Sequence, residues 1–156
     1  MKARDPWRSR IVGEGEEDPA KLVPHPANWR AHPPGQQAAL EDALGRIGWV
    51  QRVVVNRRTG RIVDGHLRVE LALARGERSV PVVYVDLAPE EERVVLATFD
   101  PIGSLAEANR EALEGLLASV ADQVPADLVP APAPPRRSRA RRRCCRDDGS
   151  TDEALA

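Results

Sequence analysis

Apolar residues recur in the first half of the chain at spacings that switch from those of a helix to those of strands. A helix is predicted from Gly35 to Gly48, because apolar residues recur at i, i+3, i+4 and i+7 from Leu40. The valine-rich run 49–55 predicts a strand with a buried centre. A five-residue hairpin loop then leads into a second strand over 61–63.

A glycine turn separates that hairpin from the next predicted helix. Gly65 lies between Asp64 and His66, and a helix over 67–75 follows. Glycine lets the backbone approach a ligand closely, and the outward N–H groups of a first helical turn favour an anion. His66 and Arg68 are two potential cations on this turn, and the planar guanidinium of Arg68 suits phosphate oxygens. The pattern indicates either an anion site or an ordinary turn with solvated charges.

Three further elements are predicted after this helix. The run 80–86 is a strand, and Pro81 either places it at a sheet edge or restricts its start. A helix opens at Pro89 with carboxylates in its first turn and ends at about Phe99, before an Asp-Pro pair. Apolar spacing predicts a last helix over 106–121.

These elements predict one small α+β domain, in which a β-hairpin and a further strand are packed by helices. The expected organisation is a flexible N-terminal arm (1–19), the domain itself (20–105), a C-terminal helix (106–122) and a disordered Pro/Arg-rich tail (123–156). Seven arginines in the segment Arg136–Arg146 would let this tail grip DNA phosphates.

Composition narrows the function classes. No apolar run is long enough to span a membrane, and residues 1–10 lack the apolar core of a secretory signal. The two cysteines, Cys144 and Cys145, are adjacent, so they predict neither a disulfide framework nor a zinc site. The formal net charge of −1 argues neither for nor against nucleic-acid binding. A cytoplasmic protein is expected.

Other histidines and tryptophans leave two alternatives open. His25, His32 and His66 could converge on a metal, although their spacing matches no metal motif and solvated loop histidines are the expected outcome. Trp29 and Trp49 either stack on a base or close the edge of the domain.

Four sequence blocks together resemble the ParB/sulfiredoxin superfamily. They are Pro24-His-Pro-Ala-Asn-Trp-Arg30, Gly48-Trp-Val-Gln51, Val63-Asp-Gly-His-Leu-Arg68 and Val80-Pro-Val-Val83. The chain is most similar to the short ParB-like domains of phage and plasmid proteins, which often precede DNA methyltransferases. The resemblance implies a nucleotide-binding fold with CTP or ATP and Mg²⁺ at the glycine turn, as in ParB, where CTP gates a DNA clamp. It also implies DNA, a DNA methyltransferase or a partition protein as partners.

The resemblance carries over to particular residues. Gly65 and Arg68 match the glycine and an arginine of the family's phosphate turn, and Gln51 matches the glutamine before the strand. Asn28 and Arg30 match a polar pair of the N-terminal segment.

Three departures from ParB bear on its mechanism. Asp100 lies near a Glu-Asn pair that handles magnesium in ParB, which makes this residue the candidate metal ligand. Leu67 stands where ParB has the first of two consecutive arginines, and no helix-turn-helix follows the domain.

Enzymatic branches of the superfamily offer an alternative function. Sulfiredoxin needs a cysteine in the turn, where this chain has His66. A free-serine kinase carries a similar Asp-Gly-His-His-Arg turn, and nuclease activity is often ascribed to ParB-like domains. Asp64 and His66 are then the catalytic candidates. A third hypothesis is a docking module of a modification system that has lost ligand binding.

Overall fold

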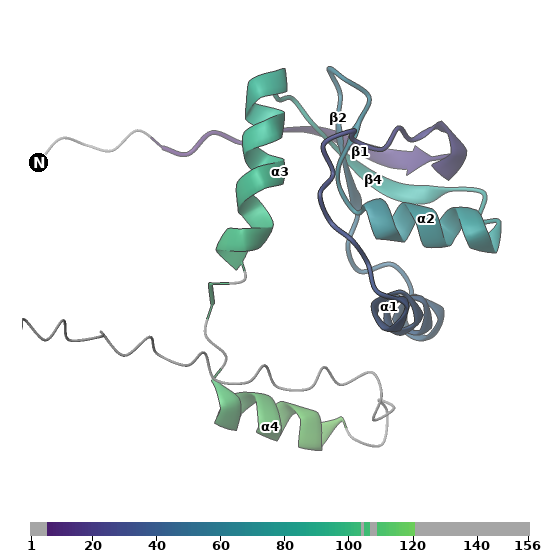
Figure 1. Cartoon of the computed structure of the whole chain (residues 1–156), viewed down its shortest axis with the longest axis vertical. Coiled ribbons are helices and arrows are strands. Elements are labelled where there is room, and N and C mark those ends of the chain that lie inside the picture. Colours follow the sequence, from purple (N-terminus) through teal and green to yellow (C-terminus); the bar gives the residue numbers. More distant parts are fainter. Residues whose placement is uncertain (1–5, 104, 107–108, 121–156) are drawn as a thin grey trace, which may run out of the picture.

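The computed structural model of the protein describes residues 6–103, 105–106 and 109–120 (Figure 1). Its elements confirm the α+β class. In chain order they are β1 (Ile11–Glu17), the 3-10 turn η1 (Pro19–Lys21), α1 (Pro34–Ile47), β2 (Val53–Asn56), β3 (Ile62–Asp64), α2 (His66–Arg75), β4 (Val80–Val85), α3 (Pro89–Gly103) and α4 (Arg110–Ser119). No helix in this part of the chain is long and apolar enough to cross a membrane.

One four-stranded sheet organises the domain, in the order β1-β4-β2-β3. β2 and β3 form the predicted antiparallel hairpin, in which the Asn56 N–H donates to the Arg61 carbonyl at 2.9 Å. β2 pairs with β4 in parallel, and a parallel pair needs a long crossover, which β3 and α2 supply. The glycine turn therefore lies where the chain leaves the sheet for α2.

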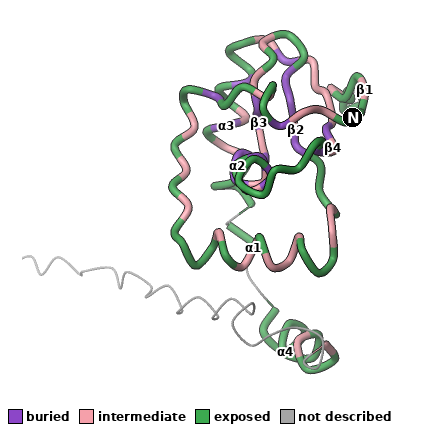
Figure 2. Tube along the Cα trace, turned by 90° about the vertical axis from the view of Figure 1, so that its right-hand side faces the viewer, coloured by how far each residue is buried: buried purple, intermediate pink, exposed green. Residues whose placement is uncertain are grey.

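The two faces of the sheet pack against different helices. Alternate residues of a strand point to opposite faces, so Val53 and Val55 face one way and Val54 the other. The main core joins the first face to α2 and consists of Val53, Val55, Ile62, Val69, Ala72, Val80 and Val82. The second face, with Val54, lies towards α3. Figure 2 shows buried residues concentrated in the strands and α2, whereas α1 is exposed or half-buried.

The predicted flexible arm over 1–19 is wrong for its second half, because residues 11–17 form β1 and pair with β4. Two of the seven residues of β1 are glycines, so the alternation of apolar and polar residues that marks a strand is not apparent in its sequence. The ring of Tyr84 lies over both glycines, at the distance of an ordinary van der Waals contact (3.8 Å) from where a Cβ at Gly13 or Gly15 would be. The strand is thus held by backbone pairing with an aromatic cover, and few apolar residues mark it.

Because β1 pairs with β4, β4 is an inner strand of the sheet and not an edge strand. Pro81 therefore does not mark an edge. It lies one residue before the pairing with β2 begins at Val82, so its missing N–H falls outside that ladder.

The helix ends differ from prediction for local reasons. α3 continues through Asp100 to Gly103, because Pro101 lies in its last turn and removes few intrahelical bonds there. α4 begins at Arg110, where the Asn109 side chain caps it by accepting from the Ala112 N–H at 3.1 Å. The predicted tail over 123–156 lies outside the described residues.

Candidate anion-binding site at the glycine turn

Gly65 makes the predicted turn between β3 and α2. Its φ of +95° lies in the left-handed region, where glycine is favoured. A Cβ at this position would lie 3.3 Å from the Val53 Cα and from the guanidinium of Arg68. The turn therefore brings the start of α2 close to β2. The N–H groups of the first turn of α2 have no intrahelical acceptor.

This turn is covered, although the sequence predicted outward N–H groups. Gly65 and the two residues after it are buried, and Arg68 folds back over the glycine. Its Nη1 donates to Gln51 Oε1 at 2.7 Å, and its Nη2 donates to Asp64 Oδ2 at 2.9 Å. The sequence prediction missed this pairing, which the i to i+4 spacing of a carboxylate and a guanidinium favours.

A second guanidinium reaches the same carboxylate. Arg30 Nη1 lies 3.6 Å from Asp64 Oδ1, and Arg30 Nε pairs with Asp100. The side chains of Arg30 and Arg68 are only 14% and 13% exposed, whereas those of Asp64 and Asp100 are 47% and 50% exposed. We name these four residues the arginine–aspartate cluster. Its guanidiniums are held within the protein, and its carboxylates lie at the solvent edge.

The segment before α1 holds Arg30 in place. The Trp29 indole N–H donates to the Leu96 carbonyl at 2.9 Å, which ties this segment to α3. The guanidinium of Arg30 lies 5.9 Å from the centre of the Trp29 ring. Asn28 Oδ1 accepts from the Arg30 N–H at 3.4 Å, so Asn28 shapes the loop that presents Arg30.

His66 faces the interior, not the solvent. It is 3% exposed, and its Nε2 accepts from the His25 N–H at 3.2 Å. Burial and the nearby Arg30 charge lower the pKa of His66 to about 4, so the ring is neutral at pH 7 and the predicted cation is absent. Because Nε2 accepts, Nδ1 carries the proton, and this atom is buried without a partner among the described residues.

A buried polar cluster behind His66 escaped sequence analysis. Glu92 of α3 is 1% exposed and its Oε2 accepts from Asn56 Nδ2 at 2.6 Å and Thr59 Oγ1 at 2.9 Å. Its Oε1 lies 3.0 Å from His25 Nε2. We name Glu92, Asn56, Thr59 and His25 the glutamate cluster. Its one sequence signal, a carboxylate in the first turn of a helix, is already explained by the helix dipole.

Neither Asp100, the candidate metal ligand, nor the three histidines form a preformed metal site, and His25 and His66 are buried, although solvated loop histidines were expected. Asp100 pairs with Arg30, and His32 contacts Gln36 at 3.2 Å while His25 and His66 contact each other elsewhere. In the described part of the chain, no three His, Cys, Asp or Glu side chains converge as metal ligands do.

An apolar cleft of about 480 Å³ adjoins the arginine–aspartate cluster. Its floor is the second face of the sheet, and α3 forms one wall. Arg30, Asp64 and Asp100 lie at its rim, together with Arg10. The remaining lining is apolar: Ile11, Val54, Val63, Val83, Val85, Leu87, Val95 and Phe99. A ligand with an apolar or aromatic body and an anionic group would suit this combination.

The fold resembles that of a chromosome-partitioning protein ParB. The chain matches the C-terminally truncated chromosome-partitioning protein ParB of Caulobacter crescentus, solved with CTP-gamma-S, with a TM-score of 0.55 and 20% identity. The match covers 72% of this chain and 64% of that one. The Pnob8-like ParB-N domain matches with a TM-score of 0.45 and 17% identity, over 55% of this chain and 34% of that one. No family model matches the sequence.

A curated relative shows the family. The chain is 32% identical over 73 residues to the ParB-like nuclease domain-containing protein YnaK of Escherichia coli (strain K12). The match covers 47% of this chain and 83% of YnaK. The protein therefore belongs to the ParB-like domain family, as the sequence blocks predicted.

Proposed function

We propose that this ParB-like protein binds the phosphate group of a nucleotide at the glycine turn and acts as a DNA-associated switch or adaptor. One observation carries the proposal: a carboxylate, that of Asp64, lies between the guanidiniums of Arg30 and Arg68. Two planar guanidiniums converging on one anion form a site that also suits phosphate oxygens. Asp64 occupies the position that the phosphate would take.

Exposure supports exchange of one anion for the other. Asp64 is half-exposed, so its carboxylate can turn towards water, whereas the two arginine side chains are held by Gln51, Trp29 and the sheet. Water at the half-exposed carboxylate screens its attraction to the guanidiniums, so the pair is weaker than a fully buried one. A phosphate carries more charge and more acceptor oxygens, so it would compete well with this carboxylate.

The apolar cleft offers a place for the rest of the ligand. Its rim includes Arg30 and Asp64, so a nucleotide whose phosphates reach the arginines could place its base against Phe99 and the valines. The Caulobacter crescentus ParB structure that shares this fold was solved with CTP-gamma-S. CTP and ATP are therefore the nucleotides to test first.

Magnesium fits the carboxylates at this rim. Mg²⁺ is commonly held by one or two carboxylates together with substrate phosphates and water. Asp100 pairs with Arg30 and is half exposed, so it would supply a protein oxygen once a nucleotide displaces Asp64 from the guanidiniums. When bound, the metal would neutralise part of the phosphate charge.

The geometry favours binding over the catalytic alternatives. A general base needs a free lone pair, but His66 Nε2 already accepts from the His25 N–H and Nδ1 carries the proton. Asp64, the other candidate, has both carboxylate oxygens directed at the guanidiniums of Arg30 and Arg68. Neither side chain is arranged to take a proton from a substrate hydroxyl or water, as a serine kinase or a nuclease would require.

The DNA context of the proposal comes from the family and from the sequence. The segment Arg136–Arg146, which lies outside the described residues, carries seven arginines that suit phosphate backbones. Partition or DNA-modification proteins, such as a DNA methyltransferase, are the proposed partners. The cytoplasm, where nucleotides and DNA are both present, is the proposed location.

Calorimetric titration with CTP, ATP, ADP and GTP, each with Mg²⁺, tests the proposal. We expect one of them to bind and Arg68→Ala to weaken that binding at least tenfold, about 1.4 kcal/mol. Arg75→Ala is the matched control, because Arg75 lies on the same helix with its side chain 55% exposed. Failure of all four nucleotides to bind, or equal binding by Arg68→Ala, would overturn the proposal.

A further inference from the structure

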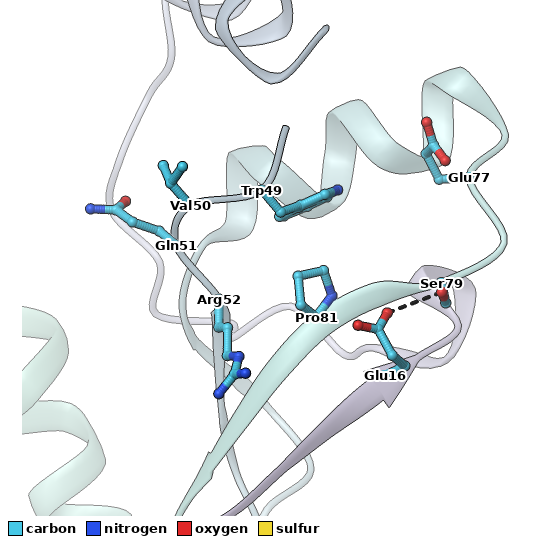
Figure 3. Close-up of a pocket in the computed structure, with 8 residues that line it drawn as sticks. All are labelled: Glu16, Trp49, Val50, Gln51, Arg52, Glu77, Ser79 and Pro81. Carbon is cyan, nitrogen blue, oxygen red and sulfur yellow. Dashed lines mark hydrogen bonds between the residues drawn. The ribbon is translucent and has the colours of Figure 1, made fainter. Parts of the chain in front are cut away.

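An open cleft of about 800 Å³ lies away from the apolar cleft, where the loop before β2 passes the ends of β1 and β4 (Figure 3). The indole of Trp49 lies above the ring of Pro81 and forms the apolar part of the lining. Carboxylates of Glu16 and Glu77 lie to the right of these rings in the figure, and Arg52 lies below. We name this feature the Trp49 cleft.

The chemistry of the Trp49 cleft suits a planar cation. A guanidinium can stack on an indole face while its N–H groups donate to carboxylates, and both contacts are available here. The Glu16 carboxylate accepts a hydrogen bond from the Ser79 hydroxyl at 3.0 Å, and its remaining lone pairs can accept further hydrogen bonds. A phosphate would meet these carboxylates as like charges, so stacking of a nucleotide base on Trp49 is disfavoured.

The basic residues around the cleft already form exchangeable pairs. Arg52 pairs with Glu14, and Arg75 Nε lies 3.3 Å from Glu77 Oε1. The side chains in both pairs are about half exposed, and exposed pairs of this kind contribute about 0–1 kcal/mol. Arginines of a partner could therefore replace Arg52 and Arg75 at these carboxylates with little loss of free energy.

The surrounding charge is acidic. Glu14, Glu16, Glu17 and Asp18 follow one another along and just after β1, and Glu16 and Glu77 line the cleft. Arg52 and Arg75 pair with two of these carboxylates and Arg78 follows Glu77 in the chain, so the acidic character is concentrated on the β1 side. A polycationic partner is therefore attracted to this end of the sheet.

We infer that the Trp49 cleft binds an arginine-rich segment, and that its occupant is residues 136–146 of the same chain. This segment carries seven arginines, so it can offer one guanidinium to the indole and others to the carboxylates. The chain between residues 120 and 136 can span up to roughly 50 Å at about 3.3 Å per residue, which exceeds the roughly 30 Å diameter of a domain of about 100 residues. Docked in this way, the arginines are withheld from DNA phosphates. The inference does not depend on nucleotide binding.

The two cysteines of the chain allow a direct test on the full protein. Both lie within the segment, so Cys145→Ser leaves Cys144 as the single site for a nitroxide spin label. The three tryptophans give three indole N–H signals in a nitrogen-15 NMR spectrum, of which Trp7 and Trp29 serve as internal controls. We expect the label to broaden the Trp49 signal most, and reduction of the nitroxide to restore it.

Charge variants and salt then test the mode of docking. Glu16→Gln with Glu77→Gln should at least halve the broadening at Trp49, whereas Glu90→Gln removes an exposed charge from α3 and should leave it unchanged. Salt at about 1 M, where the screening length is roughly 3 Å, should also abolish it. Equal broadening of all three indoles, or no effect of the double variant, would overturn the inference. Broadening that appears only when spin-labelled and isotope-labelled chains are mixed would overturn docking within one chain.

Discussion

Two polar clusters lie within this small domain, and they differ in how completely they are closed. The carboxylate of the glutamate cluster is buried: Glu92 is 1% exposed, and hydrogen bonds from buried Asn56 and half-buried Thr59 and a contact with His25 hold it. The arginine–aspartate cluster has similar pairing, but its carboxylates are about half exposed. One cluster can exchange no partner without unfolding part of the chain, whereas the other can exchange its carboxylates for another anion.

The difference follows from the elements that contribute to each cluster. Glu92 joins α3 to the hairpin through Asn56 and Thr59, and to the N-terminal segment through His25. It therefore fastens together parts of the chain that are distant in sequence. Asp64 contacts Arg68, four residues on, and Arg30 of the N-terminal segment, but its half-exposed carboxylate is open to water, so another anion can take its place. Charge at the first cluster stabilises the fold, and charge at the second is available for function.

The largest difference between the two clusters should appear when the buried carboxylate is removed. Glu92→Ala should lower the free energy of unfolding by about 3–5 kcal/mol, because the donors of Asn56 and Thr59 lose their acceptor in the interior. Urea denaturation measures the loss. Glu90→Ala, two residues earlier on an exposed position, should stay within about 0.5 kcal/mol of wild type. A loss below about 1 kcal/mol at Glu92 would show that this cluster does not hold the fold.

Lowering the pH should reduce the free energy of unfolding through His66, by less than Glu92→Ala does. Its folded pKa, about 4, lies below the ordinary value of 6.5, so the unfolded chain binds the proton more readily. Stability from this group is complete above pH 6.5, falls as the pH drops towards 4, and changes no further below. The loss is on the order of 2–3 kcal/mol.

A histidine variant isolates this contribution from that of the carboxylates. His66→Gln keeps an acceptor near the position of Nε2 for the His25 N–H but does not titrate. Urea midpoints measured between pH 7 and pH 4 should therefore fall less for this variant than for wild type. Parallel curves for the two proteins would mean that His66 does not titrate as its burial requires.

The smallest effect on stability should come from the arginine–aspartate cluster. Asp64→Asn should change the free energy of unfolding by less than about 1 kcal/mol, because it removes a half-exposed charge. The same change should strengthen nucleotide binding several-fold, since the guanidiniums lose their competing anion. Thermal melts and calorimetry measure the two effects. Loss of nucleotide binding would instead mean that Asp64 contacts the ligand or its metal ion.

The backbone turn of the site could be predicted from the sequence, whereas most of its side-chain contacts could not. Gly65 and Gln51 could be identified because a left-handed turn and a family motif leave a local signature. The burial of His66 and the pairing of Asp64 with Arg30 could not, because both depend on segments far apart in the chain. β1 was missed because two of its seven residues are glycines and three are glutamates, which leaves few of the apolar residues that mark a strand.

The alternating glycines and glutamates of β1 bear on how the protein behaves at high concentration. An outermost strand exposes unpaired backbone groups that can recruit a neighbouring molecule, and natural sheets discourage this with charge. Glu14 and Glu16 place two like charges on one face of this border, opposite Val83 and Pro81. Two copies that approached along this border would bring carboxylates together, so the acidic run protects the protein from aggregation through its own sheet.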